Sequence, residues 1–168
     1  MSNLISPRPR VLGTAKRYFP IVASQFNATY VKGLVDHVVS ELRALIPGVT
    51  TTLLQVPGSF EIPLVVRELA MQKRGGDAII AIGVILKGET NHADNLSRSV
   101  TDALQRIAIS HGVPVINAVL SFDDENQARA RCLENEINRG TEAARAAVEI
   151  ANVISTLRHR SGQALRKK

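Results

Sequence analysis

The segment from Lys87 to His92 combines a sharp turn, potential anion donors and a group that can exchange protons. Gly88 lets the backbone turn and approach a ligand closely. The amides of Glu89 and Thr90 are predicted to open a helix, and the amino end of a helix attracts phosphate. His92 is expected one turn inside that helix, where an imidazole transfers protons near neutral pH. The alternative interpretation is an ordinary helix start with a surface histidine.

Three other side chains have types that suit a polar aromatic ligand. Phe26 follows a predicted strand, where its ring could stack on a flat heterocycle; a core phenylalanine fits the same pattern. Glu61 could accept hydrogen bonds from a polyol, or complement the dipole of the helix that follows it. Arg131 could bind an anion, or belong with Arg129 to the solvated face of a helix. Each residue alone leaves both interpretations open.

The cysteine, histidine and apolar patterns exclude several classes of protein. Cys132 is the single cysteine, so an internal disulfide and a cysteine-based zinc cluster are excluded, and a buried, inert thiol is expected. No pair of histidine or acidic residues has a convincing metal-ligand spacing. No apolar run approaches the roughly 20 residues that cross a bilayer, and no signal peptide is visible. These features predict a cytoplasmic protein without a membrane partner or a bound metal.

Short apolar runs alternate with segments of helical periodicity, and these elements must position the residues above. Strands are predicted at 19–24, 51–56, 78–86 and 115–120, and helices at 28–46, 62–74, 91–110, 124–136 and 141–158. Asn27 is expected to cap the first helix. The run 78–86 is almost wholly apolar, as in a central parallel strand covered on both faces. This order predicts a single three-layer, doubly wound α/β domain of the flavodoxin-like kind, with a four-stranded parallel sheet and ligands at the carboxyl ends of its strands.

The charge is concentrated at the two ends of the chain. The formal net charge of the 168 residues is +6, but residues 1–17 carry +4 and residues 158–168 carry +5, which leaves an acidic middle of −3. We expect a basic, solvated and partly disordered arm at 1–17 and tail at 158–168 around a folded domain at 18–157. Binding of nucleic acid by these ends is the alternative. Aromatic residues make up only 4% of the chain, which is too few for a base-stacking platform.

Six segments together resemble the lumazine synthase family in their order and spacing. They are SQFN at 24–27, VPGSFEIP at 56–63, AIGVILKGETNHAD at 81–94, GVPVINAVLS at 112–121, ENQARAR at 125–131 and NRGTEAARAAVEIAN at 138–152. The resemblance implies condensation of 5-amino-6-(D-ribitylamino)uracil with 3,4-dihydroxy-2-butanone 4-phosphate. The products would be 6,7-dimethyl-8-ribityllumazine and phosphate, in the penultimate step of riboflavin biosynthesis. It implies no cofactor.

The resemblance also implies a role for particular residues. Phe26 would stack on the pyrimidine, His92 would transfer protons, and Glu61 would accept hydrogen bonds from the ribityl hydroxyls. Arg131 would bind the phosphate together with Glu89 and Thr90, of which Glu89 would contribute only its backbone amide. The other implied contacts are Ser59 and Phe60 on the ribityl side, Val84, Ile85 and Leu86 in the pyrimidine pocket, Asn117 reaching a neighbouring subunit's site, and Arg139 as further positive charge.

The family assembly implied is a homopentamer with sites between neighbours, in which the pyrimidine-side loops face Asn117 and Arg131 of the next subunit. The predicted helix 141–158 agrees, because it carries apolar residues on more than one face. The segment 132–138 lacks the glycine- and lysine-rich connection of members that form sixty-subunit shells. The sequence therefore favours the pentamer and leaves larger assemblies of pentamers open.

The sequence departs from the family near the histidine and leaves two rival functions. The family usually has an aromatic residue near position 91 or 95, and here both positions are asparagine, Asn91 and Asn95. One rival is a non-catalytic flavin- or lumazine-binding protein, but binding a flat ring alone needs neither His92 nor Arg131. The other rival is a nucleic-acid-binding protein, which the acidic middle of the chain disfavours.

Overall fold

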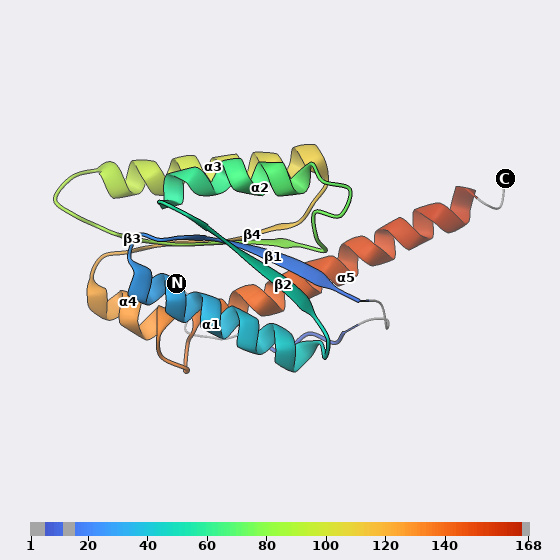
Figure 1. The fold of residues 1–168 in the computed structure, drawn as a ribbon, viewed down its shortest axis with the longest axis horizontal. Coiled ribbons are helices and arrows are strands. Elements are labelled where there is room, and N and C mark those ends of the chain that lie inside the picture. Colours follow the sequence, from blue (N-terminus) through green and yellow to red (C-terminus); the bar gives the residue numbers. More distant parts are fainter. Residues whose placement is uncertain (1–5, 12–15, 166–168) are drawn as a thin grey trace.

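The computed structural model describes residues 6–11 and 16–165, except for the side chains of residues 160–165. Four parallel strands form one sheet in the order β2-β1-β3-β4: β1 (Tyr18–Ser24), β2 (Thr50–Val56), β3 (Ile79–Leu86) and β4 (Val115–Phe122). As Figure 1 shows, α2 (Ile62–Ala70) and α3 (His92–His111) cover one face, and α1 (Ala28–Leu45), α4 (Glu125–Cys132) and α5 (Arg139–Leu165) cover the other. A single turn of 3-10 helix, η1 (Ser59–Glu61), precedes α2. The predicted three-layer, doubly wound α/β fold is confirmed.

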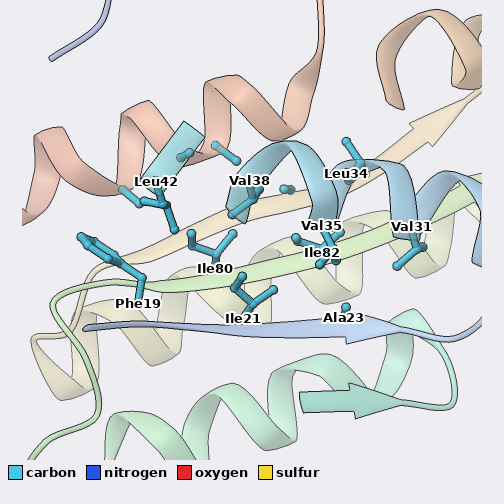
Figure 2. Close-up of a cluster of buried hydrophobic side chains, with 14 of the residues drawn as sticks. Phe19, Ile21, Ala23, Val31, Leu34, Val35, Val38, Leu42, Ile80 and Ile82 are labelled. Carbon is cyan, nitrogen blue, oxygen red and sulfur yellow. The ribbon is translucent and has the colours of Figure 1, made fainter. Parts of the chain in front are cut away.

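Strand β3 joins two separate hydrophobic cores, because every residue except the last is buried. Its side chains alternate between the cores: Ile80, Ile82 and Val84 lie in the core under α1 and α5, and Ile79, Ala81 and Ile85 lie in the core under α2 and α3. Figure 2 shows the first core, where Ile80 and Ile82 pack with Phe19 of β1 and Val38 of α1. A strand covered on both faces must be apolar throughout, which accounts for the continuous run in the sequence.

Several element ends differ from the prediction. Helix α2 ends at Ala70 rather than Arg74, because the chain then folds back so closely that a Cβ on Gly75 would lie 2.2 Å from the carbonyl oxygen of Leu69. Helix α4 ends at Cys132 rather than at 136. Helix α5 continues to Leu165 rather than ending at 158, so residues 158–165 of the tail, which was expected to be partly disordered, are helical. In Figure 1 this helix runs past the end of the sheet.

The described part of the N-terminal arm is held by the folded region rather than fully solvated. Arg8 donates two hydrogen bonds of 3.0 Å to the carboxylate of Glu41 in α1, and Arg145 of α5 donates a third of 2.7 Å. Burial raises the pKa of Glu41, but the hydrogen bonds and charges of the two arginines outweigh burial and hold that pKa below its usual value. Arg17 is buried and donates to Asp77 at 2.8 Å.

Other parts of the arm and tail predictions stay open. Residues 1–5, residues 12–15 and the basic side chains of Arg160, Arg166, Lys167 and Lys168 lie outside what the structure describes. The division into arm, domain and tail at 1–17, 18–157 and 158–168 therefore remains a prediction. None of the described helices is long and apolar enough to span a membrane.

Replacing Glu41 by Gln keeps the shape of the side chain and removes the charge that two arginines neutralise. We expect the free energy of unfolding to fall by about 2 kcal/mol at neutral pH, since charge-assisted hydrogen bonds to a buried group are lost. Because the folded chain lowers the pKa of Glu41, this contribution is present above the unfolded value of about 4.5 and is lost as the pH falls through the folded pKa. Urea denaturation at about pH 7 and pH 3 measures it.

The exposed pair of Lys32 and Asp36, 2.6 Å apart, provides the control. Asp36→Asn should change the free energy of unfolding by no more than about 0.5 kcal/mol. An equal loss for Glu41→Gln at both pH values would contradict the assignment of a charged Glu41.

Candidate active site at the carboxyl edge of the sheet

A cavity of about 430 Å³ lies at the carboxyl end of β3, between the loops that follow β1, β2 and β3. Strands β1 and β3 are neighbours in the sheet, whereas the helices that follow them, α1 and α3, lie on opposite faces (Figure 1). Such a change of direction opens a crevice at the carboxyl ends of the strands in doubly wound sheets. The volume is typical of a small-molecule site.

Eight residues proposed from the sequence line this one cavity. They are Phe26, Ser59, Phe60, Val84, Ile85, Leu86, Thr90 and His92. Phe26 and Phe60 are 71% and 68% exposed, so the alternative of Phe26 as a core residue is wrong. Exposed rings beside an apolar hollow are available to stack on a flat ligand or to be covered by another chain.

Asn27 joins the loop after β1 to the end of β3. The hydrogen-bonded pairing of these strands ends at Ala23 and Ile82, and the carbonyl of Val84 lies beyond it. Asn27 has a left-handed backbone with φ of 57°, and its Nδ2 donates to that carbonyl at 2.8 Å. Its side chain makes no capping hydrogen bond, so the prediction of a side-chain cap is wrong. The side-chain amide of Asn27 instead donates to the carbonyl of Val84, which lies beyond the paired residues of β1 and β3.

Gly83 allows η1 to lie against β3. A Cβ at this position would stand 2.6 Å from Oγ of Ser59. Ser59 is buried against the strand, and Phe60 beside it is exposed at the cavity. Only a residue without a side chain permits this approach. Gly83 was not among the predicted site residues, although a lone glycine within an apolar strand indicates a close backbone approach.

Glu61 lies beside the cavity but is not part of its lining. Its carboxylate accepts a hydrogen bond of 2.8 Å from the amide of Gly58 at the start of η1. This contact caps the 3-10 turn η1, and it differs from the predicted alternative of Glu61 in the first turn of helix 62–74, because Glu61 lies just before α2. Glu89 is likewise absent from the lining.

Helix α3 begins at His92, so His92 is its first residue and not one turn inside it. Glu89 and Thr90 lie in bends of the preceding loop, and the prediction that their amides open the helix is wrong. Asn91, at the cap position, makes no side-chain hydrogen bond to the first turn. The amino end of α3 therefore borders the cavity with its first amides uncapped by a side chain, which suits an anion.

Other lining residues were missed by the sequence analysis. They are Asn27, Gly58, Ala93 and Leu96, whereas Gly88 was expected to approach a ligand. Leu96 follows His92 by one helical turn, and this spacing is the signal that could have identified it.

Lys87 fastens the loop after β3 to the loop after β4. Its Nζ lies 2.7 Å from Oδ1 of Asp123 and 4.0 Å from Oδ1 of Asp94. The hydrogen bond and charge of Asp123, with the charge of Asp94, raise the pKa of Lys87, and Lys87 in turn lowers the pKa of Asp123. Lys87 is thus a charged lysine that holds the cavity loop in place.

Three predicted site residues lie away from the cavity. Asn117 and Arg139 share a separate hollow of about 330 Å³ between β4 and α5, and Arg131 lies half-buried on α4. Asn117 accepts from the amide of Val119 and donates to Thr101, each at 3.0 Å, while Arg139 pairs with Glu142. One chain therefore does not bring the two groups of residues together.

Cys132 is buried, as expected, under α1 and the sheet. Burial raises the pKa of its thiol to about 12. The thiol is therefore protonated at neutral pH and has no role as a nucleophile.

Comparison with known proteins adds independent information to this geometry. The model of a family described as 6,7-dimethyl-8-ribityllumazine synthase matches residues 17–155. A 6,7-dimethyl-8-ribityllumazine synthase from Paraburkholderia phymatum is 41% identical over 143 residues, which cover 84% of this chain and 80% of the relative. One from Burkholderia multivorans is 41% identical over 138 residues, which cover 82% and 77%.

Proposed function

The chain belongs to the 6,7-dimethyl-8-ribityllumazine synthase family, and from that premise we propose how its residues carry out the reaction. It is a transferase of riboflavin biosynthesis that condenses 5-amino-6-(D-ribitylamino)uracil with 3,4-dihydroxy-2-butanone 4-phosphate. The products are 6,7-dimethyl-8-ribityllumazine, phosphate and two molecules of water. The observation that supports our assignment of residues is the single cavity that joins an exposed phenyl ring, the amino end of a helix and a histidine.

The pyrimidine would lie against the ring of Phe26, with the ends of β3 and η1 on its other sides. Phe26 is exposed and borders the cavity, so its face is open to a flat heterocycle. The backbone of Val84 to Leu86 would offer polar groups to the ring, and Ser59, Phe60 and Glu61 would contact the ribityl chain. One oxygen of the Glu61 carboxylate accepts a hydrogen bond from the amide of Gly58. To accept one from a ribityl hydroxyl, Glu61 would either give up that bond or use its other oxygen.

The phosphate of the second substrate would bind at the amino end of α3. The loop amides of Glu89 and Thr90 and the uncapped first turn supply donors and a favourable dipole. A guanidinium adds bidentate hydrogen bonds to phosphate, and we assign this role to Arg131 of a neighbouring subunit. Arg139 and Asn117 would lie at the same boundary, since their hollow opens on the surface of the chain.

His92 would move the protons. The amine of the pyrimidine adds to the ketone, and loss of water gives an imine; departure of phosphate and closure of the ring with loss of a second water complete the product. Each step transfers protons between nitrogen, carbon and oxygen atoms of the substrates, which one imidazole beside the phosphate can mediate. His92 borders the cavity at the required end of α3.

The minimal active unit would be a homopentamer. In the single chain the rings of Phe26 and Phe60 are exposed, as are Leu64 and Ile109 on the α2 and α3 layer. A head-to-tail cyclic interface covers such surfaces and brings different residues of two copies together. It would unite the cavity with Arg131 and Asn117 of the next subunit. The proposal leaves open larger assemblies of pentamers. It also includes a cytoplasmic location, which the free thiol of Cys132 supports.

His92→Ala should lower kcat by about 100-fold, at the low end for loss of a general acid–base, because parts of the reaction proceed without a catalyst. The affinity for the pyrimidine should change little. Steady-state kinetics followed by lumazine absorbance, with calorimetric titration of the pyrimidine, separates the two quantities. Wild-type turnover by this variant would remove His92 from its role.

Arg131→Ala should weaken binding of the butanone phosphate by roughly tenfold to a hundredfold, since a charge-assisted hydrogen bond contributes about 1.5–3 kcal/mol. The affinity for the pyrimidine should be nearly unchanged. Arg129→Ala, on the same helix, is the matched control and should bind both substrates normally. Equal losses for both substrates in Arg131→Ala would indicate a folding defect or a wrong assignment.

The active species should have a mass of about 91 kDa, five copies of the 18.2 kDa chain, or a multiple of it. Light scattering coupled to size exclusion measures this. Mixed assemblies of His92→Ala and Arg131→Ala chains give a sharper test, since about a quarter of head-to-tail boundaries then hold both native residues. Activity should rise above that of either variant, and an active 18.2 kDa species would rule out the shared site.

A further inference from the structure

A second and larger hollow, of about 990 Å³, lies at the amino edge of the sheet, opposite the active-site cavity. Five segments distant in sequence line it: the entry to β1, the start of β2, the loop between α2 and β3, the end of α3, and the part of α5 between Ala151 and His159. Figure 1 shows α5 running past this edge of the sheet. No residue of its lining belongs to the active-site cavity.

The lining of this hollow is strongly basic. It holds five cationic groups, those of Lys16, Arg17, Lys73, Arg74 and Arg158, and one carboxylate, that of Asp77. Asp77 is already used, because it accepts from Arg17 at 2.8 Å and from the amide of Tyr18 at 2.8 Å. Among the described residues, Lys16, Lys73 and Arg74 form no ion pair with a carboxylate. Lys16 and Arg17 before β1 and Arg158 in α5 thus lie around the same hollow.

Helix ends explain only part of this charge. The carboxyl ends of α2 and α3 lie at this edge, and each carries about half a negative charge that attracts cations. Arg158 is such a cation at the end of α3, because its guanidinium donates to the carbonyl of Gly112 at 2.7 Å. After both helix ends and Asp77 are neutralised, about three positive charges remain uncompensated around one hollow.

The loop that carries Lys73 and Arg74 is held in a defined shape. Gly76 has φ of +113°, and a Cβ there would lie 2.5 Å from Cδ of Pro20 in β1. Gly75 packs equally closely on the end of α2. These close contacts fix the path of the backbone that carries Lys73 and Arg74 to the hollow.

We propose that this hollow binds a small anion that carries two or more linked phosphate groups. The uncompensated charge matches such an anion, and the hydroxyls of Thr50, Thr52 and Ser155 in the lining add neutral donors. A nucleic acid fits less well, because the cations surround one hollow rather than following a strand. Among the described lining residues the aromatic rings are those of Tyr18, His111 and His159, which come from three separate segments, so the site offers no continuous succession of rings for bases.

The test is calorimetric titration of the full-length protein with inorganic triphosphate at low salt. Lys73→Ala/Arg74→Ala should weaken binding by on the order of tenfold, because both side chains are exposed and each contributes modestly. Added salt should weaken wild-type binding and reduce the difference between the two proteins. Lys32→Ala removes an exposed cation elsewhere and is the matched control, expected to bind like wild type.

Further arms separate this hollow from the phosphate position of the active site. Arg131→Ala should keep the triphosphate affinity that Lys73→Ala/Arg74→Ala loses, and lumazine formation should persist in Lys73→Ala/Arg74→Ala. Loss of binding in Arg131→Ala alone, an equal loss in Lys32→Ala, or unchanged affinity in the double variant would each overturn the proposal. Tighter, Lys73-dependent binding of a single-stranded oligonucleotide would replace it with a nucleic-acid site. If Lys73→Ala/Arg74→Ala has a lower melting temperature than the wild type, the single variant Arg74→Gln replaces it in the titration.

Discussion

The side chains of strand β3 must pack into a hydrophobic core on each face of the sheet, and the remainder of the molecule depends on this requirement. Its side chains fill the space under α1 and α5 on one face and under α2 and α3 on the other. Each core needs its own helical layer, so the connections after β1 and β3 must leave the sheet in opposite directions. The crevice between those connections is the candidate active-site cavity. The two cores and the position of this cavity are therefore consequences of the same topology.

The two edges of the sheet have different chemistry for the same reason. At the carboxyl edge, loops approach β3 closely through Gly83 and Asn27 and leave an apolar cavity beside the start of a helix. At the amino edge, helices end and strands begin, and the chain places basic side chains there. Arg131 and Asn117 belong to neither hollow. Asn117 lies instead in the hollow between β4 and α5, and Arg131 is half-buried on α4.

Local patterns predicted the fold and most of the cavity, whereas contacts between distant residues were missed. The apolar run of β3 and the helical periodicities depend on neighbouring residues, and the predicted sheet follows from them. Asn27 illustrates the failure. Its residue type favours a helix cap, but its side chain instead donates to a carbonyl 57 positions later. The pairing of Glu41 with Arg8 and Arg145 was invisible for the same reason. The late start of α3, which places His92 at its first residue, depends on the conformation of a loop rather than on periodicity.

The contact between Arg17 and Asn152 has a consequence for the synthesis of the chain. Arg17, just before β1, is buried and donates to a side chain 135 positions later, and Asn152 itself donates to the carbonyl of Arg10. The alanines of α5 close the core under β1 and α1 from the same late segment. A ribosome delivers the N-terminal strand first, so this strand stays incompletely covered until the last helix has emerged. A stalled or truncated nascent chain would therefore expose an apolar strand to chaperones and proteases.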